Sequence, residues 1–140
     1  MNTIEAAMGG AGLTSFPHVL RASGCADVLA GGGPFTIFAP TDAAFEKFSR
    51  ASLDHLLRGD AELLRAVAGY HFAAGKVLAA RFAGKRIRAL THEGSHLIID
   101  GKGRLRVNGA HVVKPDIIAG ACVIHVIDQV LWPRKPGATL

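Results

Sequence analysis

The chain has 140 residues, the size of a single domain, and its 49% hydrophobic and 19% charged residues exclude an intrinsically disordered polypeptide. No apolar run approaches the roughly 18 residues of a membrane-spanning helix, and residues 1–12 lack the basic and apolar regions of a signal peptide. The net charge of +5 favours contact with anionic surfaces.

Short helices are expected at the start of the chain. The first covers residues 3–8, the second runs from Ser15, a candidate N-cap, to Gly24, and the third covers residues 26–29. A glycine run at residues 31–33 follows. Because it lacks the Gly-Lys-Ser/Thr ending of a phosphate loop and precedes a strand, it indicates a flexible lead-in and not a nucleotide site.

The next stretch predicts a strand that turns directly into a helix. Its first residues are apolar and β-prone, and Pro40 ends the strand because it has no amide for a sheet ladder. Thr41 or Asp42 is then expected to accept a hydrogen bond from the first amides of the helix. Aromatic side chains on both sides of this corner are expected to form a core nucleus: Phe35, Phe38, Phe45 and Phe48.

Two further helices are predicted before the pattern changes. Ser52 and Asp60 are their candidate N-caps, and Gly69 ends the second one. From Tyr70 onward apolar and polar residues alternate, which indicates strands. Helices that precede hairpin-linked strands predict an α+β or mainly-β fold rather than an alternating βαβ one.

The second half of the chain predicts an antiparallel sheet. A β-meander is expected over residues 85–108, a short strand at 112–113, a turn at Lys114–Asp116 and a long strand over 122–131. Residues 134–140 are expected to form a flexible tail.

One string resembles a zinc-protease motif. His92-Glu93-Gly94-Ser95-His96 reads H-E-x-x-H, but that motif binds zinc only on a helix, where both imidazoles lie on one face. Gly94 and Ser95 are poor helix formers and the flanks alternate like strands, which favours a polar hairpin turn. A zinc hydrolase using His92 and His96 is therefore the weakest of three functional hypotheses.

The remaining nucleophile candidates also favour structural roles. Cys122 and His125 are three residues apart on a predicted strand, so they face opposite sides and do not form a catalytic pair. His125 lies in an apolar run and is expected to be buried and hydrogen-bonded. Cys25 and Cys122 allow one disulfide at most, and two buried free thiols are favoured over a bond.

A basic face is expected on the meander. The arginines of two alternating strands, with Lys85 and Lys102, would point outward together, either as an ordinary solvated face or as a polyanion site: Arg86, Arg88, Arg104 and Arg106. Because no aromatic residues are interleaved with them, stacking on single-stranded nucleic acid is disfavoured.

Several motifs in this order resemble the fasciclin-like domain. Residues 35–45 look like its first signature, and Gly69-Tyr70-His71 matches its Tyr-His motif. Val107-Asn108-Gly109-Ala110 resembles the segment ahead of the second signature, and residues 123–128 look like that signature itself. The likeness runs from about residue 3 to residue 133 without a large gap, so residues 1–133 are expected to be one domain.

The resemblance implies a compact β-wedge of about seven strands with a helical layer from the N-terminal half. It also implies a non-enzymatic adhesion or interaction module without a cofactor, exported or displayed at the cell surface. A protein or glycan partner is expected for a monomeric domain. Because no signal peptide is visible in residues 1–12, a cytoplasmic location stays open. The alternative function is a polyanion-binding or small-ligand-binding protein that uses the basic strand face.

The resemblance also suggests site residues. An Asp-Ile pair assigned to integrin contact in animal relatives corresponds to Asp116 and Ile117, and the Tyr-His motif assigned to adhesion corresponds to Tyr70 and His71. Each pair also has a structural interpretation, as a turn or as a buried polar pair. The two signatures are expected to meet in the core, with Thr41 or Asp42 near His125 or Asp128.

Overall fold

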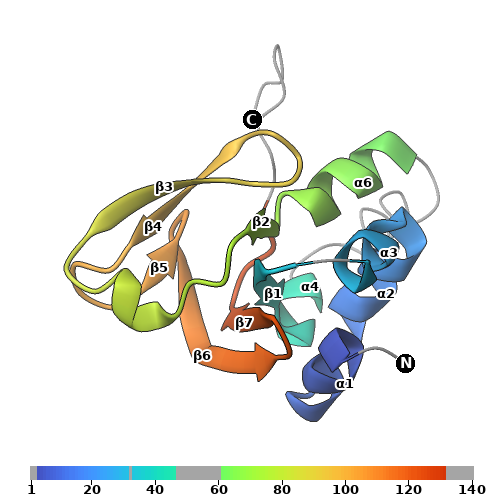
Figure 1. Ribbon diagram of the computed structural model, residues 1–140, viewed down its shortest axis with the longest axis horizontal. Coiled ribbons are helices and arrows are strands. Elements are labelled where there is room, and N and C mark those ends of the chain that lie inside the picture. The colour runs from blue at the N-terminus through green and yellow to red at the C-terminus, as the bar shows by residue number, and fades with distance from the viewer. Residues whose placement is uncertain (1–2, 32, 47–60, 132–140) are drawn as a thin grey trace.

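The computed structural model describes residues 3–31, 33–46 and 61–131. Helices gather on one side of the molecule and strands on the other, as Figure 1 shows. The helices are α1 (Thr3–Gly10), α2 (Ser15–Ser23), α3 (Cys25–Ala30), α4 (Asp42–Glu46) and α6 (Ala61–Gly69), with a 3-10 turn η1 (Ala79–Arg81) between strands. None of the helices in these ranges is both long and apolar enough to cross a membrane.

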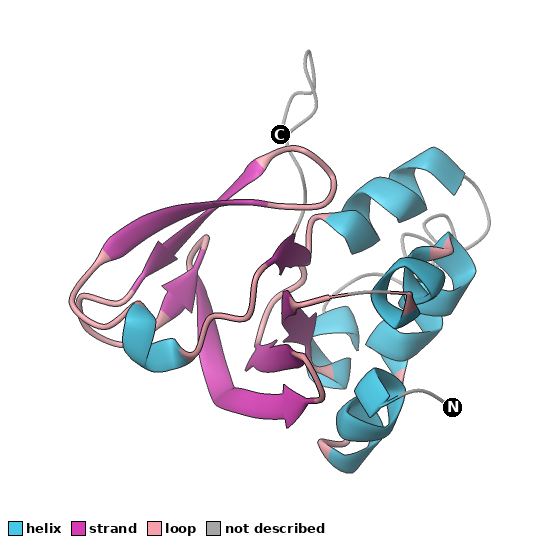
Figure 2. Ribbon diagram, in the orientation of Figure 1, coloured by secondary structure: helices cyan, strands magenta, loops and turns pink. Residues whose placement is uncertain are grey.

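The strands form one seven-stranded mixed sheet in the order β2-β1-β7-β6-β5-β4-β3. They are β1 (Phe35–Pro40), β2 (Phe72–Ala74), β3 (Arg86–Leu90), β4 (His96–Asp100), β5 (Arg106–Val107), β6 (Ala110–Ala119) and β7 (Cys122–Ile127). Strands β1 and β7 are parallel, and the other neighbours are antiparallel. The predicted fold class, an α+β or mainly-β wedge with a helical layer from the N-terminal half, is confirmed (Figure 2).

The two signature segments lie side by side at the centre of this sheet. Thr36 of β1 is opposite Val123 of β7, and the pairing continues to Pro40 and Ile127. The prediction that they meet in the core is therefore confirmed. The Thr41 amide donates to the Ile127 carbonyl at 2.9 Å, next to Asp128 in the chain.

Thr41 caps α4 as predicted, whereas Asp42 caps another helix. The Thr41 hydroxyl accepts from the Ala44 amide at 3.0 Å and caps α4. Asp42 turns away and caps α2, accepting from the Thr14 and Ser15 amides at 2.9 Å each and from the Thr14 hydroxyl. The prediction that Ser15 is the N-cap is wrong, because Ser15 is already helical and the carboxylate of a distant residue satisfies its amide.

Strands β1 and β7 separate two apolar cores. Alternate residues of each strand face the helices or the meander, as the period of a strand requires. Phe45 lies in the core beneath the helices, Phe35 packs against it from a partly buried position, and Phe38 lies in the core beneath the meander. The predicted aromatic nucleus is therefore divided between the two cores, and Phe48 lies outside the described residues.

Other expected elements differ in extent. The meander is confirmed, although β5 has only two residues. The last strand ends at Ile127, where the chain leaves the sheet, and does not continue to residue 131 as predicted. Ser52, Asp60 and the tail at residues 134–140 lie outside the described residues.

Candidate functional site

A bulge interrupts β6 where the sequence predicts a turn. The register of β6 against β7 shifts between Val112 and Lys114, and again between Lys114 and Ile117. Pro115 has no amide to donate, and Asp116 adopts a left-handed conformation with φ of 60°, which aspartate tolerates better than most residues. The predicted turn at Lys114–Asp116 is wrong, because pairing with β7 resumes at Ile117 and keeps both parts in one strand.

The backbone and the carboxylate of Asp116 both make hydrogen bonds. The Asp116 Oδ1 atom accepts from the Ala79 amide at 2.8 Å. The Asp116 amide donates to Nδ1 of His125 at 3.2 Å, and Oδ1 lies 3.8 Å from the same nitrogen. The Asp116 side chain is nevertheless 41% exposed, so it fixes the bulge and still faces solvent.

His125 is the buried centre of this contact. Its side chain is fully buried, lies opposite Phe38 in the parallel pair and stacks on that ring. Its Nε2 donates to the Val77 carbonyl at 2.9 Å, because Nδ1 is already occupied as an acceptor. Burial lowers the pKa of His125, and the Val77 carbonyl and the Asp116 carboxylate only partly oppose this. The predicted buried, hydrogen-bonded histidine is confirmed.

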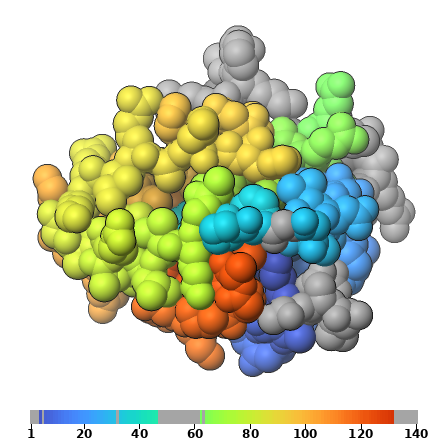
Figure 3. Space-filling model, viewed as in Figure 1, coloured from blue at the N-terminus to red at the C-terminus, as the bar shows by residue number. Residues whose placement is uncertain are grey.

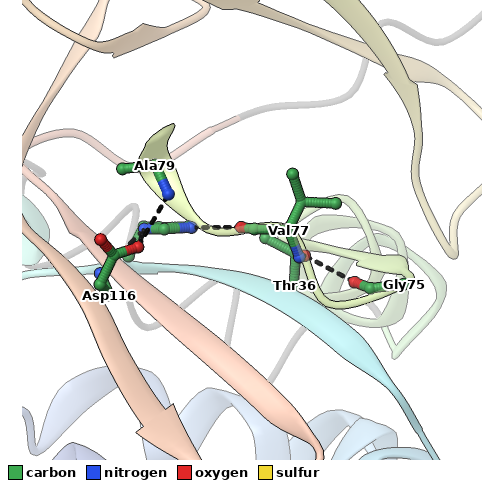
Figure 4. A network of polar contacts seen from close by, with 6 residues as sticks. Thr36, Gly75, Val77, Ala79 and Asp116 are labelled. Atoms are coloured by element: carbon green, nitrogen blue, oxygen red, sulfur yellow. Dashed lines mark hydrogen bonds and ion pairs between the residues drawn. The ribbon is translucent and has the colours of Figure 1, made fainter. Parts of the chain in front are cut away.

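Three neighbouring strands thereby hold one connecting segment, residues 75–79. The Thr36 hydroxyl donates to the Gly75 carbonyl at 2.6 Å and accepts from the Val77 amide at 2.9 Å. His125 and Asp116 add the contacts to Val77 and Ala79, and Figure 4 shows this network. Sequence reasoning did not find Thr36 or this segment, because their partners lie about 40 positions apart and no local pattern links them.

The part of β6 that carries the bulge has one unpaired edge among the described strands. Strand β5 pairs only with Ala110 and His111, whereas β7 accompanies β6 to its end. Val113 and Ile118 on this part are large apolar side chains with exposures of 55% and 52%. Ile117 is half-buried and packs against the core beneath the helices, so its exposed neighbour Ile118 offers more contact area.

Tyr70, which follows α6, links strand β4 to the turn between β5 and β6 from a buried position. Its hydroxyl donates to the His96 carbonyl at 2.7 Å and accepts from the Asn108 side-chain amide at 2.9 Å. Asn108, with φ of 50°, also bonds both backbone groups of Ile98. Because Tyr70 is only 5% exposed, these contacts indicate that it holds the meander to the end of α6.

His71 is fully buried and joins two distant segments. Its Nδ1 donates to the Val67 carbonyl at 2.6 Å, and its Nε2 accepts from the Leu131 amide at 2.9 Å. Burial lowers its pKa from 6.5 to about 4, and the bond to Val67 offsets this only in part. The imidazole is therefore a neutral link between α6 and the segment after β7.

Two arginines of the meander, one on each side of Asp100, form a row across strands β3, β4 and β5. Arg86 is opposite Asp100 and Asp100 is opposite Arg106, so the three side chains share an exposed face. Arg106 and Asp100 form an ion pair of 4.0 Å, which reduces the positive charge of the row. Arg88 is exposed on β3, and Arg104 is exposed in the loop before β5.

The other candidates take structural positions. The string from His92 to His96 spans the loop between β3 and β4, as predicted, and not a helix. Within the described ranges no group of three or more His, Cys, Asp or Glu residues could hold a metal ion. Cys25 and Cys122 are free, buried thiols in the core beneath the helices.

Comparison with known proteins gives one consistent result. The model of the fasciclin domain matches residues 11–133. The Synechocystis protein sll1735 is 36% identical over 131 residues, which are 93% of this chain and 96% of that protein. The cell surface glycolipoprotein MPB83 of Mycobacterium bovis is 37% identical over 103 residues, 73% of this chain but only 45% of that protein.

A solved structure shows the same fold. A FAS1 domain pair from the insect cell adhesion molecule Fasciclin I superposes with a TM-score of 0.64 at 21% identity, covering 84% of this chain and 44% of that one. At this identity the match concerns the arrangement of strands and helices, and it agrees with the mixed sheet described above.

Proposed function

Because the chain belongs to the fasciclin domain family, we propose that it is a non-enzymatic interaction module that binds a protein partner at the cell surface through the bulged half of β6. We define this surface, the β6 edge, as Val113 to Ile118. One observation carries the proposal: this part of β6 has no strand on its outer side among the described residues, and there exposed apolar side chains flank a bulge that hydrogen bonds hold in place.

The chemistry of the β6 edge suits a protein partner. Val113 and Ile118 supply apolar contact area, and Lys114 and Asp116 supply charges of both signs beside it. Pro115 and the shifted register prevent a partner strand from pairing along the whole edge, so side chains carry most of the contact. The bonds from Asp116 to Ala79 and His125 hold the bulge in one shape before binding, which lowers the entropy lost on association.

Attachment of beads coated with the domain to cells of the source organism tests the proposal. The double variant Val113→Asp with Ile118→Asp is expected to abolish attachment, because it places charge in the apolar part of the surface. Leu90→Asp is the matched control, since Leu90 is 58% exposed on β3, outside the β6 edge. Equal attachment by the double variant and the wild type, or equal loss in the control, would contradict the β6 edge as the binding surface.

The row of arginines supports a second function, binding of a polyanion such as an acidic polysaccharide. Arg86 and Arg106 share an exposed face, and Lys85, Lys102 and Arg104 are exposed nearby in the chain. Retention on a heparin column is expected to fall when the four arginines of the predicted basic face are replaced by glutamine, and to fall steeply with salt. Unchanged retention of that fourfold variant would remove this function.

A further inference from the structure

A cavity of about 250 Å³ opens beneath the meander, and none of the residues that line it belongs to the β6 edge. Strands β1, β2, β3 and β4 and the η1 segment contribute its walls, among them Phe38, Val77, Phe82, Ala89 and Ile99. In Figure 3 the yellow-green residues of η1 and β3 form the surface at the end of the molecule away from the helices.

The inside of the cavity is apolar. Phe38, Phe82 and Ile99 are buried side chains, and Ile87 packs beside them. The one polar side chain among the buried lining residues is Thr36, whose hydroxyl already bonds Gly75 and Val77. An apolar cavity without free polar groups holds water poorly and accepts apolar molecules.

Two positively charged side chains lie at the opening of the cavity, which we call its mouth. Arg81 and Lys85 line the cavity and are exposed to solvent. Within the described residues neither side chain forms an ion pair, so both charges are available to a ligand. Lys76 is also exposed near this segment in the chain, but its ammonium group bonds the Gly120 carbonyl instead.

Both sides of the mouth are held in place. The network of Thr36, His125 and Asp116 fixes the segment before η1. After η1, the Gly84 amide donates to the Gly101 carbonyl, and the Gly101 amide donates to the Lys85 carbonyl, each at 2.7 Å. A Cβ atom at Gly101 would collide with the Phe82 carbonyl, so only glycine permits this close approach. The site is therefore formed before any ligand arrives.

We propose that this cavity binds a small apolar carboxylate, with the hydrocarbon part against Phe38, Phe82 and Ile99 and the carboxylate at Arg81 and Lys85. A dry cavity of roughly 150 Å³ accepts benzene, so this cavity suits a ligand of about ten heavy atoms. Arginine holds carboxylates through two parallel hydrogen bonds, and the neighbouring lysine adds a second charge.

Two probes of the same shape separate the apolar part from the charge. The uniformly labelled domain is titrated with 3-phenylpropionate and, separately, with the neutral 3-phenylpropan-1-ol, and binding is followed from amide shifts in the NMR spectrum. Binding of the acid is expected to reach saturation, with the largest amide shifts in residues 77–89. The acid is expected to bind about tenfold more tightly than the alcohol, as one charge-assisted hydrogen bond implies.

Variants test each part of the site. Arg81→Gln combined with Lys85→Gln is expected to bring the acid down to the affinity of the alcohol, whereas Ala89→Phe fills the cavity and removes binding of both. Arg88→Gln is the matched control, since Arg88 neighbours Ala89 but lies on the opposite face of β3. The native dispersion of each spectrum shows that the variant is folded.

Three results would overturn the proposal. The first is a titration with the acid that does not saturate at about 10 mM, where even a ligand with a Kd of 1 mM is mostly bound. The second is an alcohol that binds as tightly as the acid, which would remove the role of the two cations. The third is binding that persists in the folded Ala89→Phe variant, which would place the ligand elsewhere.

Discussion

The amide of Asp116 donates to Nδ1 of His125 across two neighbouring strands, and Oδ1 of the Asp116 carboxylate, 3.8 Å from the same ring nitrogen, accepts from the Ala79 amide. An exposed bulge is thus tied to a fully buried imidazole. This relationship explains how β6 keeps a fixed shape at the point where its ladder is interrupted.

Replacing Asp116 is expected to release the segment that it holds. Asp116→Ala removes the acceptor for Ala79 and places alanine at positive φ, so we expect a loss of about 1–3 kcal/mol of stability. Hydrogen exchange of the Ala79 amide should become at least about tenfold faster. Asp116→Asn keeps both an acceptor and a residue that tolerates this conformation, and it should stay close to the wild type.

Lys114→Ala is the control for this measurement, because Lys114 is exposed in the same bulge and no hydrogen bond from its side chain holds the segment. If the Ala79 amide exchanges at the same rate in Asp116→Ala as in Lys114→Ala, the carboxylate does not hold the segment.

The buried His71 predicts a loss of stability in acid. An unfolded imidazole takes up a proton near pH 6.5, whereas the folded one does so only near its pKa of about 4. Protonation therefore favours the unfolded chain between these values, so stability is complete above pH 6.5 and falls as the pH drops toward 4. The expected loss is about 3 kcal/mol.

Urea unfolding at pH 7 and pH 4.5 measures this effect. His71→Gln should be less stable than the wild type at pH 7, because one of two buried bonds is lost, and should show a smaller difference between the two pH values. His18→Gln, at an exposed position on α2, is the control. An unchanged difference in His71→Gln would exclude this imidazole as a source of the acid sensitivity.

Tyr70 and Asn108 are expected to act as one unit. Tyr70→Phe removes the hydroxyl that joins His96 and Asn108 and should cost about 1–2 kcal/mol. Asn108→Gly keeps the left-handed backbone while removing the side-chain bonds. In a double-mutant cycle of unfolding free energies, the two changes should cost less together than their sum by at least about 0.5 kcal/mol. Strict additivity would show that their contact contributes nothing.

Gly101 offers a test of the loop that carries Lys85. Gly101→Ala forces a methyl group against the Phe82 carbonyl and should cost about 1–3 kcal/mol, as in other overpacked sites. Gly103→Ala is the matched control, since a Cβ there meets no atom within 4 Å. Thermal unfolding compares the two variants, and equal midpoints would mean that the close approach at Gly101 is not required.

The sequence predicted features that depend on neighbouring residues or on motifs shared with the fasciclin domain. The Thr41 cap lies three residues from its partner, and the prediction that the β1 and β7 segments meet in the core rests on their resemblance to the two fasciclin signatures. The burial of the His125 side chain was also predictable, because apolar residues flank it in the sequence.

Features that depend on distant partners were not predictable. Asp42 caps a helix that begins 27 positions earlier, although its local sequence fits the cap of α4 equally well. Pro115 and Asp116 have the local chemistry of a turn, but the ladder with β7 beyond them keeps β6 in one strand. Thr36 gives no local sign of the segment that it holds, because that contact exists only in the folded chain.

A competition measurement tests binding through the β6 edge most directly. Soluble wild-type domain and soluble Leu90→Asp are expected to displace wild-type beads from cells at the same concentration. Soluble Val113→Asp with Ile118→Asp, shown to be folded by circular dichroism, is expected not to displace them at a concentration at least about a hundredfold higher, as the loss of two apolar anchors implies. Displacement by the double variant at the wild-type concentration would contradict binding through the β6 edge.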